Sequence, residues 1–346
     1  MSYDGFEIDM LNLGDADSIL VTRWTNNVPS RVLIDGGNVS DSAKVISFLK
    51  ARGATYLDHI VCSHPHDDHA AGLVGVVQSK DVTFGSAWMH LPWNHVNFDD
   101  LGAALRRGDA DAKRVVKIVR ESVETGHDLY EAITARGKLP AEPFEGTSIG
   151  FLKVCGPTQT YHEELLADFT DYEKLKAMDE AIASHEQDIQ LEEILEHTLF
   201  GQEILEKTGS VLGGSPTQPE NNSSTILGTI YGGETFLFTA DAGVEGLTMA
   251  KNAYQLADLR WMQIPHHGSR RNVTSELIEH FNPQTAYVSA SGSRKHPRRA
   301  VVNAFKNVGA KVYSTHYPLP NGSNKWFHRG SVPDRPEYSS TKPLYD

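Results

Sequence analysis

The sequence predicts a single α/β domain that carries an acidic helical insertion. Three observations predict it: short apolar runs that alternate with helical periodicity, one segment that holds most of the net charge, and a cluster of metal-binding side chains at the end of one strand. The chain has 346 residues, of which 39% are hydrophobic, enough for a full core. No apolar run reaches the roughly 18 residues that a membrane-spanning helix needs.

Composition also limits the kinds of site and the compartment. The N-terminal sequence MSYDGFEIDM lacks the basic start and the apolar stretch of a secretion signal, so we expect a cytoplasmic protein without a membrane partner. Cys62 and Cys155 are the only cysteines, too few for a disulfide framework or a structural zinc knuckle. Any metal site must therefore use histidine and carboxylate side chains.

The first half of the chain reads as strands followed by helices. Alternating apolar residues, separated by turn residues, predict three β segments at the start, and the segment before the metal-binding cluster is also strand-like. Helical spacing predicts the helices. The expected strands are 6–13, 18–24, 31–37, 57–62, 82–91 and 150–157, and the expected helices are about 41–52, 70–78 and 101–136.

The second half repeats this alternation after the insertion. Gly232 and Gly233 join two strands as a hairpin, 224–231 and 234–241. A helix after Asp241 comes next, followed by strands at 259–264, 285–291 and 311–315 and helices at 275–281 and 300–308. We treat residues 1–346 as one domain with helical insertions at about 100–136 and 158–210 and an irregular tail at 317–346.

The charge is concentrated in the second insertion. Residues 160–206 hold fourteen Asp or Glu against Lys174 and Lys176, so this segment carries most of the net charge of −13. A pair of solvated helices is the simplest interpretation, and a lid or a surface for a protein regulator is the alternative. The rest of the chain is close to neutral, so the overall charge does not exclude a polyanionic substrate.

The strongest functional signal is the run IVCSHPHDDH at residues 60–69. His64, His66, Asp68 and His69 place four metal-binding side chains within six residues, directly after an apolar strand. Imidazoles and a carboxylate crowded so tightly fit poorly in a core, whereas zinc and related ions bind this set of donors. Asp241 and the pair His266 and His267 also end apolar strands, and strand ends converge at one edge of a sheet.

With these motifs the chain resembles the metallo-β-lactamase fold superfamily, and within it the branch of the ComEC-type competence nuclease domain and the phosphorylcholine esterases. The segments that carry the resemblance are LNLGDADSILV, RVLIDGG, CSHPHDDHAAGL, NNSSTILGTIYGGETFLFTADA, IPHHGS and VSASGSRKHP. The resemblance implies an αββα sandwich with the inserted acidic segment, and a site for two divalent ions, Zn²⁺ or Mn²⁺, at one edge of the two sheets.

The resemblance also implies a role for each ligand. His64 and His66 would hold the first ion, Asp68 and His69 the second, and Asp241 would bridge them. One of His266 and His267 would complete the second site, and the spacing leaves open which. A further histidine of many superfamily members is replaced here by Asn221 or Asn222, and His90 is a candidate substitute. Asp35, and less directly Asp67, would orient a ligand histidine.

The surroundings of this site suggest its substrate. Basic residues follow the ligand pair, and arginine suits contact with phosphate oxygens. The candidate substrate-binding residues are Arg270, Arg271, Arg294, Lys295 and Asn222. Ordinary surface charge is the alternative interpretation. His296, in the HP element of the family, is a candidate to protonate a leaving oxygen, and Asp68 and Asp241 are the other catalytic candidates.

These observations predict a hydrolase that uses a metal-bound hydroxide on phosphodiester bonds, most plausibly those of DNA. A small-molecule phosphodiesterase for phosphocholine-like or cyclic nucleotide substrates is the first alternative. A non-catalytic protein that binds partners through the acidic helices is the second, and it predicts function without metal.

Overall fold

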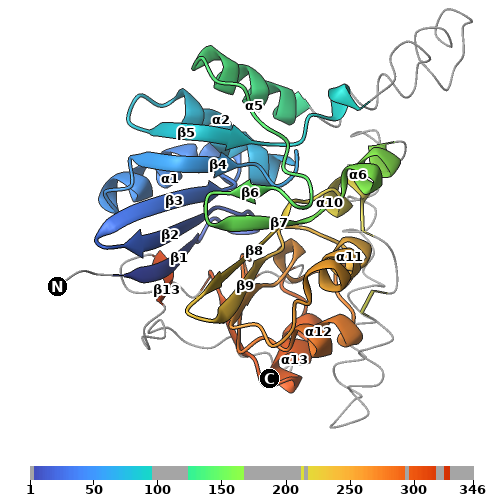
Figure 1. Ribbon diagram of the computed structural model, residues 1–346. Helices are drawn as coiled ribbons and strands as arrows, with labels where there is room; N and C mark the ends of the chain where they lie inside the picture. Colours follow the sequence, from blue (N-terminus) through green and yellow to red (C-terminus); the bar gives the residue numbers. More distant parts are fainter. Residues whose placement is uncertain are drawn as a thin grey trace, which may run out of the picture.

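The protein folds as two β-sheets packed face to face, with helices on both outer faces (Figure 1). The computed structural model describes residues 4–95, 124–166, 212–213, 217–292, 296–316 and 323–327. Among these residues, no helix is both long enough and apolar enough to span a membrane. The layers follow the αββα order that the resemblance implies, so the predicted fold class is confirmed. Most of the acidic segment lies outside the described residues.

The first sheet is built mainly from the start of the chain. Its strands lie in the order β13 (Ser323–Phe327), β1 (Gly5–Leu11), β2 (Ile19–Thr25), β3 (Val28–Ile34), β4 (Tyr56–Val61) and β5 (Thr83–Trp88). The elements on its outer face are α1 (Ser42–Ala51), α2 (Asp67–Gln78) and α5 (Glu124–Ala135), with the short turns η1 (Val39–Asp41) and η2 (Pro92–Asn94).

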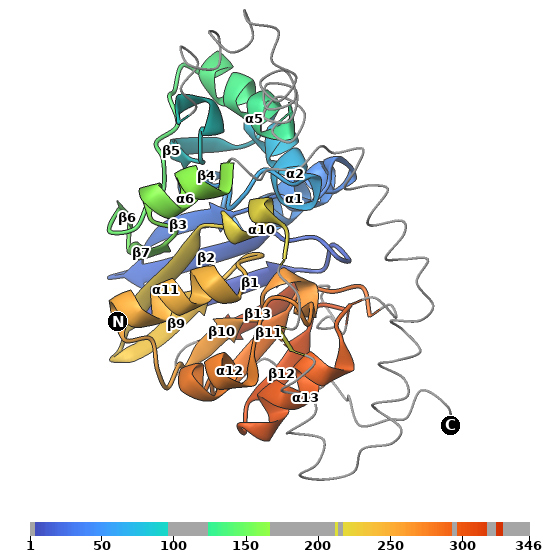
Figure 2. The same cartoon turned by 90° about the vertical axis from the view of Figure 1, so that its right-hand side faces the viewer.

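The second sheet holds the remaining strands, in the order β12 (Lys311–Ser314), β11 (Thr285–Val288), β10 (Trp261–Gln263), β9 (Glu234–Phe238), β8 (Ile226–Tyr231), β7 (Leu152–Gly156) and β6 (Ser148–Ile149). Figure 2 shows α11 (Val244–Tyr254), α12 (Ser275–Phe281) and α13 (Arg299–Asn307) over its outer face. The shorter elements α6 (Gln159–Leu166), α10 (Pro219–Asn222) and η3 (His266–Gly268) lie near the edge where the site is found.

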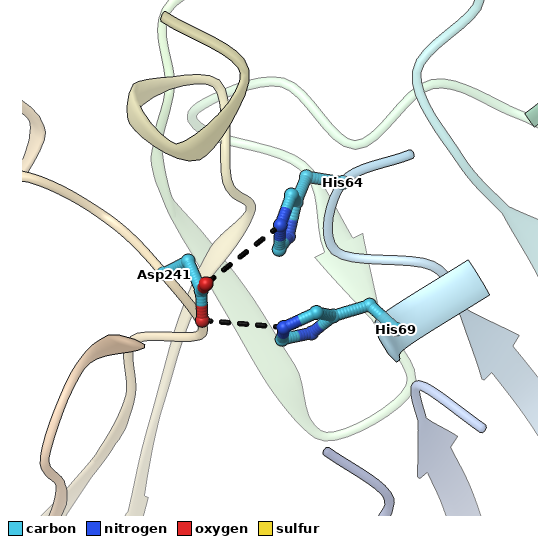
Figure 3. Close-up of side chains that lie close together, drawn as sticks. All are labelled: His64, His69 and Asp241. Carbon is cyan, nitrogen blue, oxygen red and sulfur yellow. Dashed lines mark ion pairs between the residues drawn. The ribbon is translucent and has the colours of Figure 1, made fainter. Parts of the chain in front are cut away.

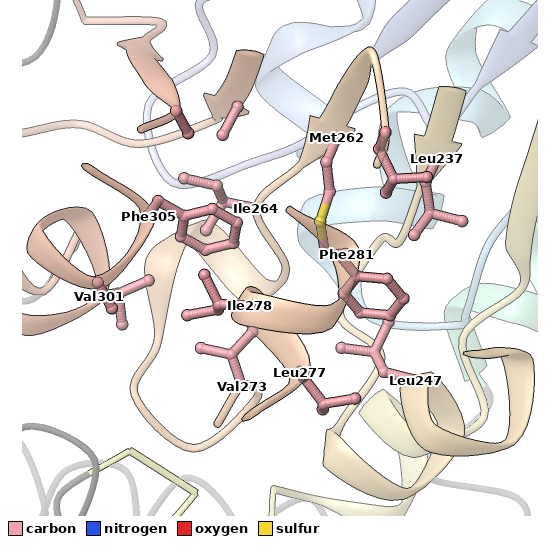
Figure 4. Close-up of a cluster of buried hydrophobic side chains, with 14 of the residues drawn as sticks. Leu237, Leu247, Met262, Ile264, Val273, Leu277, Ile278, Phe281, Val301 and Phe305 are labelled. Carbon is pink, nitrogen blue, oxygen red and sulfur yellow. The ribbon is translucent and has the colours of Figure 1, made fainter. Parts of the chain in front are cut away.

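Alternation along the strands explains the layered packing. Phe236 and Phe238 of β9 face the core between the sheets, whereas Leu237 faces the helices α11 and α12. The same division holds for Trp261 and Met262 of β10. Figure 4 shows the resulting cluster, in which helix residues interlock with Leu237 and Met262. A strand that is apolar on both faces needs cover on both sides, and this requirement produces the sandwich.

The tail differs from the sequence expectation at one point. Residues 317–346 were expected to be irregular, but Ser323–Phe327 forms β13 and pairs antiparallel with β1, Glu7 opposite Phe327. Five residues with little apolar alternation give no strand signal, and the free edge of β1 supplies the hydrogen-bonding partner instead. In the range 100–136, the structure describes α5 from Glu124 onwards as helix.

Candidate metal centre

The hexad forms a loop that leads directly into a helix. Strand β4 ends at Val61, His66 is the N-cap residue of α2, and Asp68 and His69 lie in the first turn of that helix. The side chains of His64 and His69 are buried, and that of Asp68 is 32% exposed. Gly36 and Gly72 let α2 approach the loop after β3, because a Cβ on Gly72 would overlap the carbonyl oxygen of Gly36. This contact fixes the direction in which α2 presents His69.

His64, in the loop after β4, and His69, in α2, face the carboxylate of Asp241, which follows β9 (Figure 3). His69 Nε2 lies 3.2 Å from Asp241 Oδ1, and His64 Nε2 lies 3.9 Å from Asp241 Oδ2. Two ligands held about 2.1 Å from one ion lie roughly 3 to 4 Å apart, so each oxygen of Asp241 and the imidazole that it faces are spaced as two ligands of one ion. Asp241 thus meets one imidazole with each of its oxygens.

A second group forms around Asp68. His267 Nε2 lies 3.3 Å from Asp68 Oδ2, and His69 Nε2 lies 3.9 Å from Asp68 Oδ1. Among the described residues, His69 takes part in three groups of possible metal ligands: His64–His69–Asp241, Asp68–His69–His267 and, through its other ring nitrogen, Asp17–Asp35–His69. The first two groups, which adjoin and have a shared member, suit two neighbouring ions.

The other ring nitrogen of each histidine has an oxygen partner. His69 Nδ1 lies 2.8 Å from Asp35 Oδ2, and His267 Nδ1 lies 2.9 Å from the carbonyl oxygen of Ser289. His64 Nδ1 lies 3.1 Å from Ser63 Oγ, whose own proton goes to Asp35 Oδ2. When its ring is neutral, each histidine then donates the Nδ1 proton outward and keeps a lone pair on Nε2 for an ion.

Buried atoms without partners complete the case for metal binding. Nε2 of His64, Nε2 of His69 and Oδ1 of Asp241 are buried and make no hydrogen bond. Buried polar atoms are rarely left unsatisfied, and divalent ions would satisfy all three. The residues therefore fit the metal ions that the fold implies.

The carboxylates dominate the electrostatics of the centre. Burial favours the neutral ring of His69, but Asp241, Asp68 and Asp35 outweigh it and hold the pKa of His69 well above its ordinary value. Burial opposes the charge of Asp241 too, yet His266, His69 and His267 keep its pKa well below the usual range. In the protein alone, protons on histidine thus balance the carboxylates, and an ion would replace them.

Residues 14–153 match the family model of the metallo-beta-lactamase superfamily. This match covers the hexad and most of the first sheet, and it supports the superfamily predicted from the motifs. A curated relative, ComE operon protein 3 of Bacillus subtilis (strain 168), is 25% identical over 348 residues. The alignment covers 94% of this chain and 33% of that protein, so the chain spans about a third of the length of the relative.

Two solved structures are similar to this chain at low identity. The metallo-beta-lactamase fold protein YhfI from Bacillus subtilis aligns with 10% identity and a TM-score of 0.45, over 94% of this chain and 100% of that chain. The hydrolase AbOPH, of the beta lactamase superfamily, aligns with 14% identity and a TM-score of 0.32, over 90% and 78% of the two chains.

Two residues of the candidate site were not predicted from the sequence. The Nε2 of buried Gln263 donates to Asp17 Oδ2 at 2.8 Å, and its Oε1 accepts from the backbone N–H of Thr239 and of Ala240. Gln263 thus ties the turn before Asp241 to the first sheet, and burial raises the pKa of Asp17 to about 6. Asp17 ends a turn, and Gln263 ends an apolar strand. A single polar residue at such a position does not by itself indicate a functional site.

The remaining predicted residues lie at different distances from the centre. His66 is partly buried, with its ring 4.7 Å from that of His64. The ring of His296 lies 5.7 Å from that of His266, so His296 borders the site. Asp67 is exposed, and it accepts a hydrogen bond from Thr125 on α5 instead of orienting a histidine.

The candidate substrate contacts are only partly described. Arg270 and Arg271 follow η3 and are partly buried, whereas Arg294 and Lys295 lie outside the described residues. Asn222 lies in α10, and its Oδ1 is buried without a hydrogen-bond partner. His90 Nε2 lies 3.1 Å from Thr225 Oγ1, and the ring of His90 stacks on His162 instead of facing the centre.

Proposed function

We propose that this chain is a metal-dependent hydrolase that cleaves phosphodiester bonds, with DNA as its substrate. The observation that carries the proposal is the convergence of imidazole Nε2 atoms on the carboxylates of Asp68 and Asp241 at one edge of the sandwich. A structural metal site is closed by its ligands, whereas this centre keeps a partly exposed carboxylate, Asp68, at its margin. Such a margin leaves room for a substrate.

The proposed chemistry divides between the ions and the chain. When bound, two divalent ions would lower the pKa of water and stabilise negative charge on a phosphate. His64, His69, Asp241 and Asp68 would hold them, and Asp35 and Ser289 would keep two of the histidines in the correct tautomer. His296 lies within reach of the centre to give a proton to the leaving oxygen.

Arginines support a phosphodiester over a neutral substrate. Arg270 and Arg271 follow His267 by three and four residues, directly after the turn η3, so they lie beside the candidate metal ligands in sequence. Guanidinium groups pair well with phosphate oxygens and would make DNA affinity fall as salt rises. The resemblance to the ComEC-type nuclease domain points the same way.

The test is cleavage of supercoiled plasmid by the purified protein with Mn²⁺ or Zn²⁺. We expect nicking that a chelator abolishes and that the isosteric variant Asp68→Asn lacks. Asp128→Asn, a change to an exposed carboxylate on α5, is the matched control and should cleave like the wild type. Arg270→Ala with Arg271→Ala should weaken DNA binding and lower its salt dependence by about one unit of slope for each arginine.

Parallel reactions with bis(p-nitrophenyl) phosphate and p-nitrophenylphosphorylcholine separate the alternatives. Metal-dependent turnover of these esters with intact plasmid would replace DNA by a small phosphodiester as the substrate. No turnover of any ester by a protein that binds metal would contradict the phosphodiesterase proposal itself.

A further inference from the structure

We infer that His266 and His267 serve different ions, so that His266 supplies the first ion with the nitrogen that Asn221 and Asn222 cannot provide. The inference rests on the proposed metal centre. The motif requires one ligand from the pair His266 and His267, whereas the inference makes both of them ligands. It is carried by the two oxygens of Asp241, the tautomer of His266 and the backbone of the turn η3.

The two oxygens of Asp241 sort the histidines into two sets. Oδ1 lies 3.2 Å from His69 Nε2. Oδ2 lies 3.9 Å from His64 Nε2 and 3.6 Å from His266 Nε2. His266 therefore shares its carboxylate oxygen with His64, the ligand expected for the first ion, and not with His69.

His267 belongs to the other set. Its Nε2 lies 3.3 Å from Asp68 Oδ2, and its ring centre is 5.7 Å from that of His69. The rings of His266 and His267 are inclined at 74° to each other, so neighbouring residues present their nitrogens to different places. His267 thus completes the group around Asp68 and His69, and His266 remains for the other ion.

Hydrogen bonds to Asn272 fix the tautomer that His266 needs as a ligand. Asn272 is fully buried, and its Nδ2 donates to the carbonyl oxygens of Asp241 and Ala242, at 2.8 and 3.3 Å. Its Oδ1 must then accept from His266 Nδ1, 3.0 Å away. The proton of His266 therefore sits on Nδ1, and Nε2 presents a lone pair towards Asp241.

Asn221 approaches His266 from the same side as Asn272. Its side-chain amide lies 3.3 Å from His266 Nδ1 and 3.0 Å from Thr217 Oγ1. Asn221 thus contacts the nitrogen of His266 that faces away from Asp241. With the proton of His266 on Nδ1, the Nδ2 of Asn221 only contacts this ring and donates its hydrogen bond to Thr217 Oγ1.

The backbone of η3 shows that this arrangement has a cost. His266 and His267 have φ values of 48° and 52°, in the left-handed region that β-carbons disfavour. Each such residue costs about 1 to 3 kcal/mol and persists where its surroundings demand it. A turn that needed only one ligand could place the other residue freely, whereas here both histidines are held.

His266 is also the member that can adjust to an ion. Its side chain is 25% exposed, whereas those of His64, His69, Asp241 and His267 are almost fully buried. His266 belongs to neither of the ligand groups His64–His69–Asp241 and Asp68–His69–His267. We therefore expect His266 to move inward when the first ion binds.

The test is metal stoichiometry, measured by mass spectrometry of desalted protein, with Zn²⁺ affinity from competition with a chromophoric chelator. Wild type should bind two ions. His266→Ala and His266→Asn should keep one ion and lose at least about 100-fold in affinity for the other, since even outer partners of ligands cost 10- to 100-fold. Adding His267→Ala should remove the second ion as well. His127→Ala, in an exposed cluster on α5, is the control and should keep two ions.

Circular dichroism melts establish that each variant is folded before its metal is counted. Two ions bound at wild-type affinity in folded His266→Ala or His266→Asn would overturn the inference. A wild type that binds no divalent ion would overturn both this inference and the proposed function. A protein that binds two ions by this pattern but cleaves no phosphodiester would contradict the proposed function and leave the ligand assignment standing.

Discussion

The two halves of the centre are built from different kinds of backbone. We call His64, Asp68 and His69 the first-sheet side and Asp241, His266 and His267 the second-sheet side. The first-sheet side comes from one loop and the first turn of α2, and none of its three residues has a positive φ. On the second-sheet side, Ala240, His266 and His267 all do. Regular structure thus delivers one set of ligands, and strained turns deliver the other.

This difference decides what can be predicted from sequence. His64, His66, Asp68 and His69 stand within six residues of one loop and the first turn of α2, so they were recognisable from residues alone. Asp241 and the pair His266 and His267 were found only as polar residues at strand ends. Which member of the pair faces Asp68 depends on two left-handed residues, and no spacing encodes that.

The fold was predictable for a similar reason. Alternation located the strands of both sheets within a few residues, because each strand is apolar on at least one face. The isolated strand β13 was not predicted, since it forms by pairing and not by pattern. Gln263 and Asp17 were missed because their role depends on a hydrogen bond between residues 246 positions apart.

The largest effect should come from Asp241, which touches both sides. Asp241→Asn keeps the shape but removes the charge that faces His69 and His64. We expect metal affinity to fall by more than about 100-fold and cleavage to fall with it, because outer partners alone cost 10- to 100-fold. Calorimetric titration with Zn²⁺ measures this. Unchanged affinity would show that the two sides do not share this carboxylate.

Gly72→Ala tests the first-sheet side. The added Cβ would overlap the carbonyl oxygen of Gly36, so α2 must move away from the loop after β3. We expect a loss of about 3 kcal/mol in the free energy of unfolding, measured by urea denaturation. Gly246→Ala, in helix α11, is the control for the glycine change itself, since a Cβ there would make only ordinary contacts, at 3.6 Å or more. Equal losses in both variants would contradict the steric explanation.

Acid sensitivity should arise away from both sides, at the stacked rings of His90 and His162. Burial, together with the charge of His95, lowers the pKa of His162 to about 3, and burial holds that of His90 well below its ordinary value. A histidine with a depressed pKa contributes stability that is present above the unfolded value of about 6.5 and is lost as pH falls towards the folded value. From pH 7 to 5, the loss should be about 2 kcal/mol for each ring.

His162→Phe keeps a stacked ring without a titrating group, so it should flatten the acid limb of the stability curve. Urea denaturation between pH 7 and 5 provides the measurement. A variant with the same acid limb as the wild type would place the sensitivity elsewhere.

Gln263→Leu tests the link between the sides. It removes the acceptor of the Thr239 and Ala240 N–H groups and the donor to Asp17. We expect a loss of about 1.5 kcal/mol in stability, since buried partners are left unsatisfied, and a 10- to 100-fold loss in metal affinity. Gln284→Leu, whose side chain pairs with Arg260 at the surface, should change neither. Intact metal affinity in Gln263→Leu would mean that Asp241 is positioned without this link.

The smallest effect compares one substitution on the two sides. Ala240→Gly relieves a left-handed residue with φ 45°, so we expect a neutral change or a gain of about 0.5 kcal/mol. Ala71→Gly, in the regular helix α2, should lose about 1 kcal/mol. Thermal denaturation of both variants resolves the sign. Equal losses of stability in the two variants would contradict a difference in backbone strain between the two sides.

Hydrogen bonds between the two sheets beside the metal centre also affect how fast an ion can bind. Thr225 N donates to the carbonyl oxygen of Ser63 at 2.9 Å, and Ser289 Oγ donates to that of Ala16 at 2.7 Å. Both bonds tie one sheet to the other beside the ligands, and neither uses a ligand atom. The entropy of bringing the two halves together is therefore lost during folding, before an ion binds. Metal capture should then be fast, and amide exchange in these loops should hardly change when the ions enter.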